Sequence, residues 1–98
     1  MSGWIPVGRA ETAPELQAVG EIAVARLADG SFAAFDDACT HEECPLSGGE
    51  LEGSRVVCYC HSSEFDVLTG AVLRGPAAEP LPVYETRVVD GELQVLAP

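Results

Sequence analysis

The pattern of apolar and polar positions favours strands over helices along most of the chain. Four of the clearest extended runs form two pairs, residues 21–27 with 31–36 and residues 84–89 with 92–96. Asp29-Gly30 separates the first pair and Asp90-Gly91 separates the second, and both dipeptides favour tight turns between strands. Each pair therefore predicts an antiparallel hairpin.

Shorter extended runs fill much of the remaining sequence, at residues 4–7, 55–58, 64–68 and 71–74. The first of these would add an edge strand, and the last two flank Thr69-Gly70. Only residues 13–19 have helical character, with Pro14 suited to a first helical turn. Many short strands separated by glycine-containing turns predict an antiparallel all-β domain.

Length and composition predict a single small domain covering residues 1–98. The chain has 98 residues, and its apolar fraction of 47% suits a folded domain with a core of its own. No apolar run approaches the roughly 18 residues that cross a bilayer, and the first residues lack the basic and apolar parts of a secretory signal. We therefore expect a soluble, cytoplasmic monomer that does not bind membranes.

The charge of the chain is strongly acidic and excludes one class of partner. Asp and Glu outnumber Lys and Arg by 16 to 5, which gives a formal net charge of −11. Nucleic-acid binding is excluded, because Lys and Arg contacts to phosphates supply most of the affinity in such complexes. Two interpretations stay open: a surface that is acidic for solubility alone, and electrostatic steering toward a basic patch on a partner protein.

Two short groups of cysteine and histidine carry the clearest chemical signal. Cys39 and His41 lie two positions apart, Cys58 and His61 lie three apart, and sixteen residues separate His41 from Cys58. A Cys-x-His followed by a Cys-x-x-His matches the ligand set of a Rieske [2Fe–2S] centre, in which two thiolates bind one iron and two imidazoles bind the other. We expect both cysteines on the buried iron and both histidines on the iron nearer solvent.

A zinc site is the main alternative, since zinc also binds two cysteines and two histidines. Zinc fingers usually pair cysteine with cysteine and histidine with histidine, whereas each group here is mixed, and no recognition helix or basic patch suggests DNA binding. The four cysteines could also form a disulfide framework. The interleaved histidines favour a metal site for at least two of the cysteines, and the mixed order favours iron with sulfide.

At these residues the chain resembles the Rieske [2Fe–2S] family. The resemblance runs from about residue 21 to the end and centres on Cys39-Thr40-His41 and on residues 58–66. It implies an all-β fold with a Rieske-like antiparallel β-sandwich base and a small inserted cluster-binding subdomain at about residues 38–76. It also implies one [2Fe–2S] cluster per chain.

One branch of the family, which includes the cytochrome bc complexes, provides two further expectations. Cys44 and Cys60 occupy the positions of a disulfide that joins the two ligand loops in that branch. Gly75-Pro76-Ala77 resembles the proline loop that covers the cluster there. Because cytoplasmic thiols usually stay reduced, Cys44 and Cys60 could instead be two unpaired cysteines that lie close together.

Matches and departures from the bc-complex pattern bear on the reduction potential. Ser63 matches a serine that donates a hydrogen bond to a bridging sulfide, whereas Phe65 replaces a tyrosine that donates to a cysteine sulfur. Ser62 stands where glycine is usual. Glu42 and Glu43 follow His41 where quinol-oxidising members have an apolar residue, and two carboxylates there should disfavour an extra electron. We expect an intermediate potential, below that of quinol-oxidising proteins.

The resemblance implies a soluble Rieske-type ferredoxin, an electron-transfer protein rather than an enzyme. It would carry one electron from a flavin-dependent reductase to a terminal oxygenase of a ring-hydroxylating dioxygenase-type system. Glu64 would join the acidic residues around the exit of the electron, and Arg55 and Arg74 have no visible anionic target. The alternatives are a Rieske subunit of a multi-protein oxidoreductase, such as a nitrite reductase small subunit, and a zinc-stabilised binding module.

Overall fold

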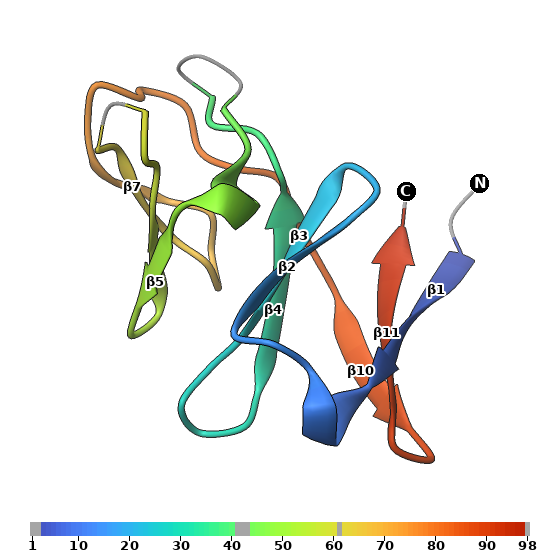
Figure 1. The fold of residues 1–98 in the computed structure, drawn as a ribbon. Helices are drawn as coiled ribbons and strands as arrows, with labels where there is room; N and C mark the ends of the chain where they lie inside the picture. The colour runs from blue at the N-terminus through green and yellow to red at the C-terminus, as the bar shows by residue number, and fades with distance from the viewer. Residues whose placement is uncertain (1–2, 41–43, 61, 98) are drawn as a thin grey trace.

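The computed structural model describes residues 3–40, 44–60 and 62–97, which form three antiparallel sheets (Figure 1). The strands are β1 (Gly3–Arg9), β2 (Leu16–Val19), β3 (Ile22–Arg26), β4 (Phe32–Asp36), β5 (Glu50–Glu52), β6 (Arg55–Val57), β7 (Glu64–Asp66), β8 (Val72–Arg74), β9 (Val83–Tyr84), β10 (Thr86–Val89) and β11 (Glu92–Ala97). The first sheet has the order β1-β11-β10, the second β2-β3-β4-β9 and the third β5-β6-β7-β8. The prediction of an all-β, antiparallel fold is confirmed.

Turn residues explain why both predicted hairpins form. Asp90 and Gly91 have φ angles of 50° and 79°, as a two-residue type I′ turn requires, and Val89 pairs with Glu92 across it. Between β3 and β4, Gly30 has a φ of 88° and the Leu27 N–H donates to the Ser31 carbonyl at 2.8 Å. The hairpin of β3 and β4 therefore closes through a three-residue loop, in which glycine takes the left-handed position.

The prediction of helical character at residues 13–19 is wrong, because this segment contains β2. Two short 3₁₀ turns, η1 (Ala10–Thr12) and η2 (Leu46–Gly48), are the only helical segments in the described ranges. Gly20, with a φ of 61°, begins a two-residue turn, and β2 then pairs with β3 from Val19 opposite Ile22 to Leu16 opposite Ala25. A helix of this length would be unstable, whereas strand pairing satisfies the backbone hydrogen-bonding groups. Neither 3₁₀ turn is long and apolar enough to span a membrane.

The second sheet lies between the other two and is buried on both faces. Ile22 and Val24 pack on one face with Leu93 of the first sheet. Ala23 and Ala25 pack on the opposite face, in a second core that continues into the third sheet. Apolar residues therefore run without interruption over the first four positions of β3, from Ile22 to Ala25, as expected of a strand segment covered on both sides.

The third sheet is an insertion between two neighbouring strands of the second sheet. The chain leaves the second sheet after β4, forms β5 to β8, and returns to pair β9 beside β4. In Figure 1 this part lies on the left, on the far side of the second sheet from β1 and β11. All four cysteines lie between the end of β4 and the start of β7, so the insertion supplies the site.

Candidate metal centre

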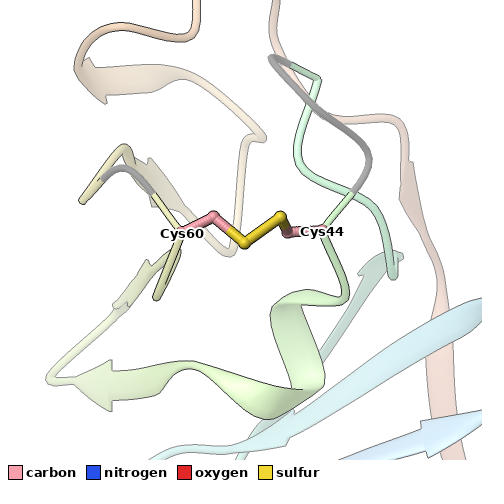
Figure 2. Close-up of a disulfide and its surroundings, with 2 residues drawn as sticks. All are labelled: Cys44 and Cys60. Atoms are coloured by element: carbon pink, nitrogen blue, oxygen red, sulfur yellow. A yellow bond between two sulfur atoms is a disulfide. The ribbon is translucent and has the colours of Figure 1, made fainter.

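A disulfide between Cys44 and Cys60 joins two loops at the same end of the third sheet, where Glu50 of β5 pairs with Val57 of β6. The first loop, residues 37–49, connects β4 to β5, and the second, residues 58–63, connects β6 to β7. The S–S distance is 1.99 Å and the two Cα atoms are 6.5 Å apart. Figure 2 shows the bridge crossing from the segment that leads into η2 to the turn that follows β6. This is the pairing that the resemblance implies.

Cys39 and Cys58 lie outside this disulfide and are buried, with exposed fractions of 1% and 0%. Both belong to the second core, together with apolar side chains from the third sheet and from η2. The sulfur atoms of Cys44, Cys58 and Cys60 lie within 4.8 Å of one another. Because two of these three sulfurs form the disulfide, they cannot act as thiolate ligands, and the grouping places the bridge against Cys58. The thiols that could bind a metal are therefore those of Cys39 and Cys58.

The two predicted histidine ligands lie outside the described residues. His41 and His61 each fall in a gap of the described ranges, as do Glu42 and Glu43. The roles of both histidines, and of the two glutamates beside His41, stay predictions. The disulfide brings together the two loops to which these histidines belong in the sequence.

Backbone hydrogen bonds hold each cysteine in its loop. The Cys39 N–H donates to the Cys44 carbonyl at 2.9 Å, which closes the first loop. In the second loop the Cys58 N–H donates to the Ser63 carbonyl at 2.8 Å, and the Ser62 N–H donates to the Cys58 carbonyl at 2.9 Å. Ser62 has a φ of 61°, a left-handed conformation that favours glycine. This conformation gives a physical reason for the glycine usual at that position in the family.

Ser63 is the one buried polar residue in the described chain, with an exposed fraction of 0%. Its Oγ accepts a hydrogen bond from the Ala77 N–H at 3.1 Å, so the segment resembling a proline loop packs against the second loop. Thr40 Oγ1 donates to the Glu79 carbonyl at 2.7 Å, which ties the same segment to the first loop. A hydroxyl that accepts one hydrogen bond keeps its own hydrogen for a second acceptor. Two buried thiols and this hydroxyl fit an iron–sulfur group.

Two arginines surround the carboxylate that follows the second loop. Glu64 Oε1 lies 3.1 Å from Arg55 Nη1, and Glu64 Oε2 lies 3.6 Å from Arg74 Nη1. Arg55 also contacts Glu52 at 2.9 Å, and its pKa is raised by that hydrogen bond and by the charge of Glu64. The expectation that these arginines lack an anionic target is therefore wrong. Glu64 is part of a balanced ion-pair network and contributes little unpaired negative charge.

The family model for the Rieske [2Fe–2S] domain matches residues 3–85. The chain belongs to the Rieske [2Fe–2S] family. It is 37% identical over 101 residues to an anthranilate 1,2-dioxygenase ferredoxin subunit of Burkholderia cepacia, a match that covers 97% of this chain and 93% of that protein.

Two solved structures show how far the similarity to Rieske proteins extends. A chain in the complex of reduced oxygenase and oxidized ferredoxin of carbazole 1,9a-dioxygenase is 34% identical, with a TM-score of 0.83 over 93% of this chain and 99% of that chain. A ferredoxin of Sphingomonas yanoikuyae B1 is 26% identical, with a TM-score of 0.88 over 98% of this chain and 100% of that chain.

These comparisons confirm the [2Fe–2S] cofactor and the ferredoxin function predicted for this Rieske chain. The three relatives named above are ferredoxins, which carry electrons and are not the catalytic components of their systems. The comparisons do not favour the alternative of a nitrite reductase small subunit. The zinc-stabilised module is not favoured either, because the matched family binds iron and sulfide.

Sequence reasoning missed two carboxylates of this Rieske domain, both at the end of β4. Asp36 accepts a hydrogen bond from the Tyr84 hydroxyl, and Asp37 accepts two hydrogen bonds from Ser47. The hydrogen bond to Asp36, with some burial, raises the pKa of Tyr84 to about 12. The only signal in the sequence is a pair of acidic residues directly before the first ligand loop, and in so acidic a chain that pair carries little information.

Proposed function

We propose that this chain carries one electron at a time from a flavin-dependent reductase to a terminal oxygenase of a ring-hydroxylating dioxygenase-type system. The main support is the pair of buried thiols in two disulfide-linked loops, in a chain similar over nearly its whole length to a dioxygenase ferredoxin subunit. The solved complex of a related ferredoxin with its oxygenase supports the choice of electron acceptor.

In this proposal Cys39 and Cys58 bind the inner iron, and His41 and His61 bind the outer iron. When bound, the cluster supplies a reversible one-electron change, and neutral imidazole ligands favour reduction relative to four thiolates. Burial of both cysteines excludes water from their side of the site. Ser63 would be able to donate its hydroxyl hydrogen to the cluster, since its oxygen already accepts a hydrogen bond from the Ala77 N–H at 3.1 Å.

We also propose that residues 38–76 act as the cluster-binding subdomain within a single domain, residues 1–98. This segment contains the four cysteines, Ser63 and all four strands of the third sheet. The second core connects it to the sandwich through side chains such as Phe35 of β4. Electron transfer would then occur at the loop end of the insertion, and the first two sheets would serve as its support.

The net charge of −11 supports a transient, electrostatic mode of binding to partners. A partner with a basic docking surface would associate faster at low ionic strength, because long-range attraction steers the encounter. Small, polar interfaces are typical of electron-transfer pairs, which must separate after each transfer. We propose that the chain acts as a cytoplasmic monomer between its two partners.

The first experiment tests the cofactor and its ligands in the purified protein. We expect two irons and a matching amount of acid-labile sulfide, and on reduction an EPR spectrum typical of mixed cysteine and histidine ligation. The midpoint potential should lie below that of quinol-oxidising Rieske proteins. Absence of iron, or the spectrum of an all-thiolate cluster, would contradict the ligand assignment.

The second experiment tests the role of the protein between two enzymes. The protein is added to a flavin-dependent reductase with NADH and to an aromatic-ring oxygenase with its substrate, and reduction and reoxidation of the cluster are followed by absorbance. We expect both steps, with rates that fall as salt rises. A cluster that is reduced but never reoxidised by any oxygenase tested would contradict the proposed acceptor.

A further inference from the structure

A carboxylate closes the base of the first ligand loop. Ser47 donates to Asp37 twice: its backbone N–H donates to Oδ1 at 2.6 Å, and its hydroxyl donates to Oδ2 at 2.6 Å. Both residues are partly buried, and ten positions separate them in the sequence. We call this pair of hydrogen bonds the Asp37–Ser47 clasp. Cys39 and Cys44 both lie between Asp37 and Ser47 in the sequence, so the clasp closes the segment that contains them.

The structure explains why a carboxylate is needed at this position. The short helix η2 starts after Pro45, whose side chain has no acceptor and makes no capping hydrogen bond. Backbone N–H groups at the start of a helix have no partner within the helix, so an acceptor must come from elsewhere. Asp37 supplies it from across the loop. Its own N–H donates to the Glu21 carbonyl at 2.9 Å, so the clasp anchors η2 to the second sheet.

The clasp acts on the buried cysteine through the residues next to it. Leu46 directly precedes Ser47, has an exposed fraction of 0%, and packs in the same core as Cys39 and Cys58. The Cys39 N–H donates to the Cys44 carbonyl inside the ring that the clasp closes. Opening the clasp would release Leu46 and let the loop around Cys39 widen.

The second ligand loop is held by other interactions. In the described part of this loop these include the backbone hydrogen bonds between Cys58 and its neighbours, the Ala77–Ser63 bond and the disulfide from Cys60 to Cys44. Loss of the clasp would therefore affect the two sides of the site unequally. The loop of Cys39 would be disturbed first, and the loop of Cys58 would keep its own hydrogen bonds.

We propose that Asp37 is a positioning residue for the cluster, acting through Ser47 to hold the first ligand loop in its binding shape. This inference rests on the proposed function, because it takes Cys39 as a cluster ligand. Asp37 contacts neither iron nor sulfide in this proposal. Its effect is on how firmly the loop retains the cluster and on how uniform the surroundings of the cluster are.

Three variants separate the hydrogen bonds of Asp37 from its charge. Asp37→Ala removes both bonds and the charge. Asp37→Asn removes the charge but can keep both bonds, because an amide oxygen accepts from the Ser47 N–H while the amide nitrogen donates to the serine oxygen. Ser47→Ala removes one bond and keeps the charge. Each cluster-loaded variant is incubated with an iron chelator, and loss of iron is followed by visible absorbance.

We expect Asp37→Ala to lose iron about tenfold faster than the wild type. A change of this size corresponds to the loss of about one hydrogen bond to a charged group. Asp37→Asn should stay close to the wild type, and Ser47→Ala should fall between them. The EPR lines should broaden in Asp37→Ala alone. The midpoint potential should rise in both Asp37 variants, because both remove a negative charge near the site.

The proposal would be overturned if Asp37→Ala lost iron at the wild-type rate. It would also be overturned if Asp37→Asn lost iron as fast as Asp37→Ala, because that result would show an effect of charge alone. If Asp37→Ala does not fold, Ser47→Ala decides: faster iron loss supports the clasp, and a wild-type rate overturns it. A wild-type protein that binds no cluster would overturn the proposed function itself, which distinguishes the two failures.

Discussion

Removal of the Cys44–Cys60 bridge is predicted to destabilise the ligand loops while leaving the sandwich folded. The two cysteines are 16 residues apart in the sequence, and closing a loop of this size lowers the entropy of the unfolded chain by an amount worth about 3 kcal/mol at 25 °C. The whole free energy of unfolding expected for a domain of this size is about 5–15 kcal/mol. The bridge therefore contributes a large share of the free energy that opposes unfolding of the two loops.

The structure indicates which part of the chain loses stability when the bridge is removed. Neither cysteine lies in a strand, and both loops pack on the second core, which also contains Cys39 and Cys58. The first core, around Val24 and Leu93, contains no residue of either loop. The loops should therefore open before the first two sheets separate, and the bound cluster should be lost with them.

The assay is a thermal melt of the cluster-loaded Cys44→Ala/Cys60→Ala variant, followed by visible absorbance for the cluster and by far-ultraviolet circular dichroism for the strands. In the wild type we expect the two transitions to lie close together. In the variant the absorbance transition should fall by about 12–24 °C, from about 3 kcal/mol at roughly 4–8 °C per kcal/mol, and the dichroism transition should fall less.

Single variants control for packing at each position. Cys44→Ala and Cys60→Ala each remove the bridge and leave one thiol, so both should melt like the double variant. A difference between them would measure the packing of the individual side chain. Coincident transitions at the wild-type temperature in the double variant would refute the argument that the bridge holds the loops.

Three further substitutions test other parts of the structure. Leu46→Ala removes a side chain with an exposed fraction of 0% and should cost about 2–5 kcal/mol in urea unfolding, with early loss of the cluster. Gly70→Ala should cost at least about 1–3 kcal/mol, because Gly70 has a φ of 81° and an added Cβ would lie 2.1 Å from the Leu81 carbonyl oxygen; unchanged stability would contradict this. The hydrogen bond between Tyr84 and Asp36 raises the tyrosine pKa from 10.0 to about 12, so its stabilising effect is complete below about pH 10 and is lost as the pH rises through about 12. Tyr84→Phe should lack this alkaline phase, and a phenolate titration of wild type minus variant checks the pKa.

The sequence predicts hairpins and ligands where a few neighbouring residues decide the structure. Asp90-Gly91 takes two left-handed conformations, which few other dipeptides adopt, so the turn and the register of both strands follow from two residues. The cysteine and histidine spacing is similarly local, because each loop presents its ligands within four consecutive residues. Such features can be found without knowing the rest of the fold.

Features that depend on distant partners could not be predicted in this way. The segment of β2 is short and mixed in character, and it is a strand because β3 offers it an edge. Glu64 meets Arg55 and Arg74 only after β6, β7 and β8 have paired in register. The Asp37–Ser47 clasp likewise joins positions on opposite sides of a loop. A periodicity or a motif contains no information about such pairs.

The two faces of β3 differ in side-chain size, and this difference suits their roles. The face toward the first sheet presents Ile22 and Val24, which fill a conventional sandwich core. The face toward the insertion presents Ala23 and Ala25, with Ala33 and Phe35 of the neighbouring β4 on the same side, and the small alanine side chains let the insertion approach β3 closely. Side chains of the insertion then fill that space, including those of Leu46, Phe65 and the two buried cysteines. The thiols of Cys39 and Cys58 are therefore part of a hydrophobic core rather than of a surface loop, and their side toward the sheet is closed to water. In the proposed function, an electron would therefore be exchanged with a partner on the side of the site away from the second sheet.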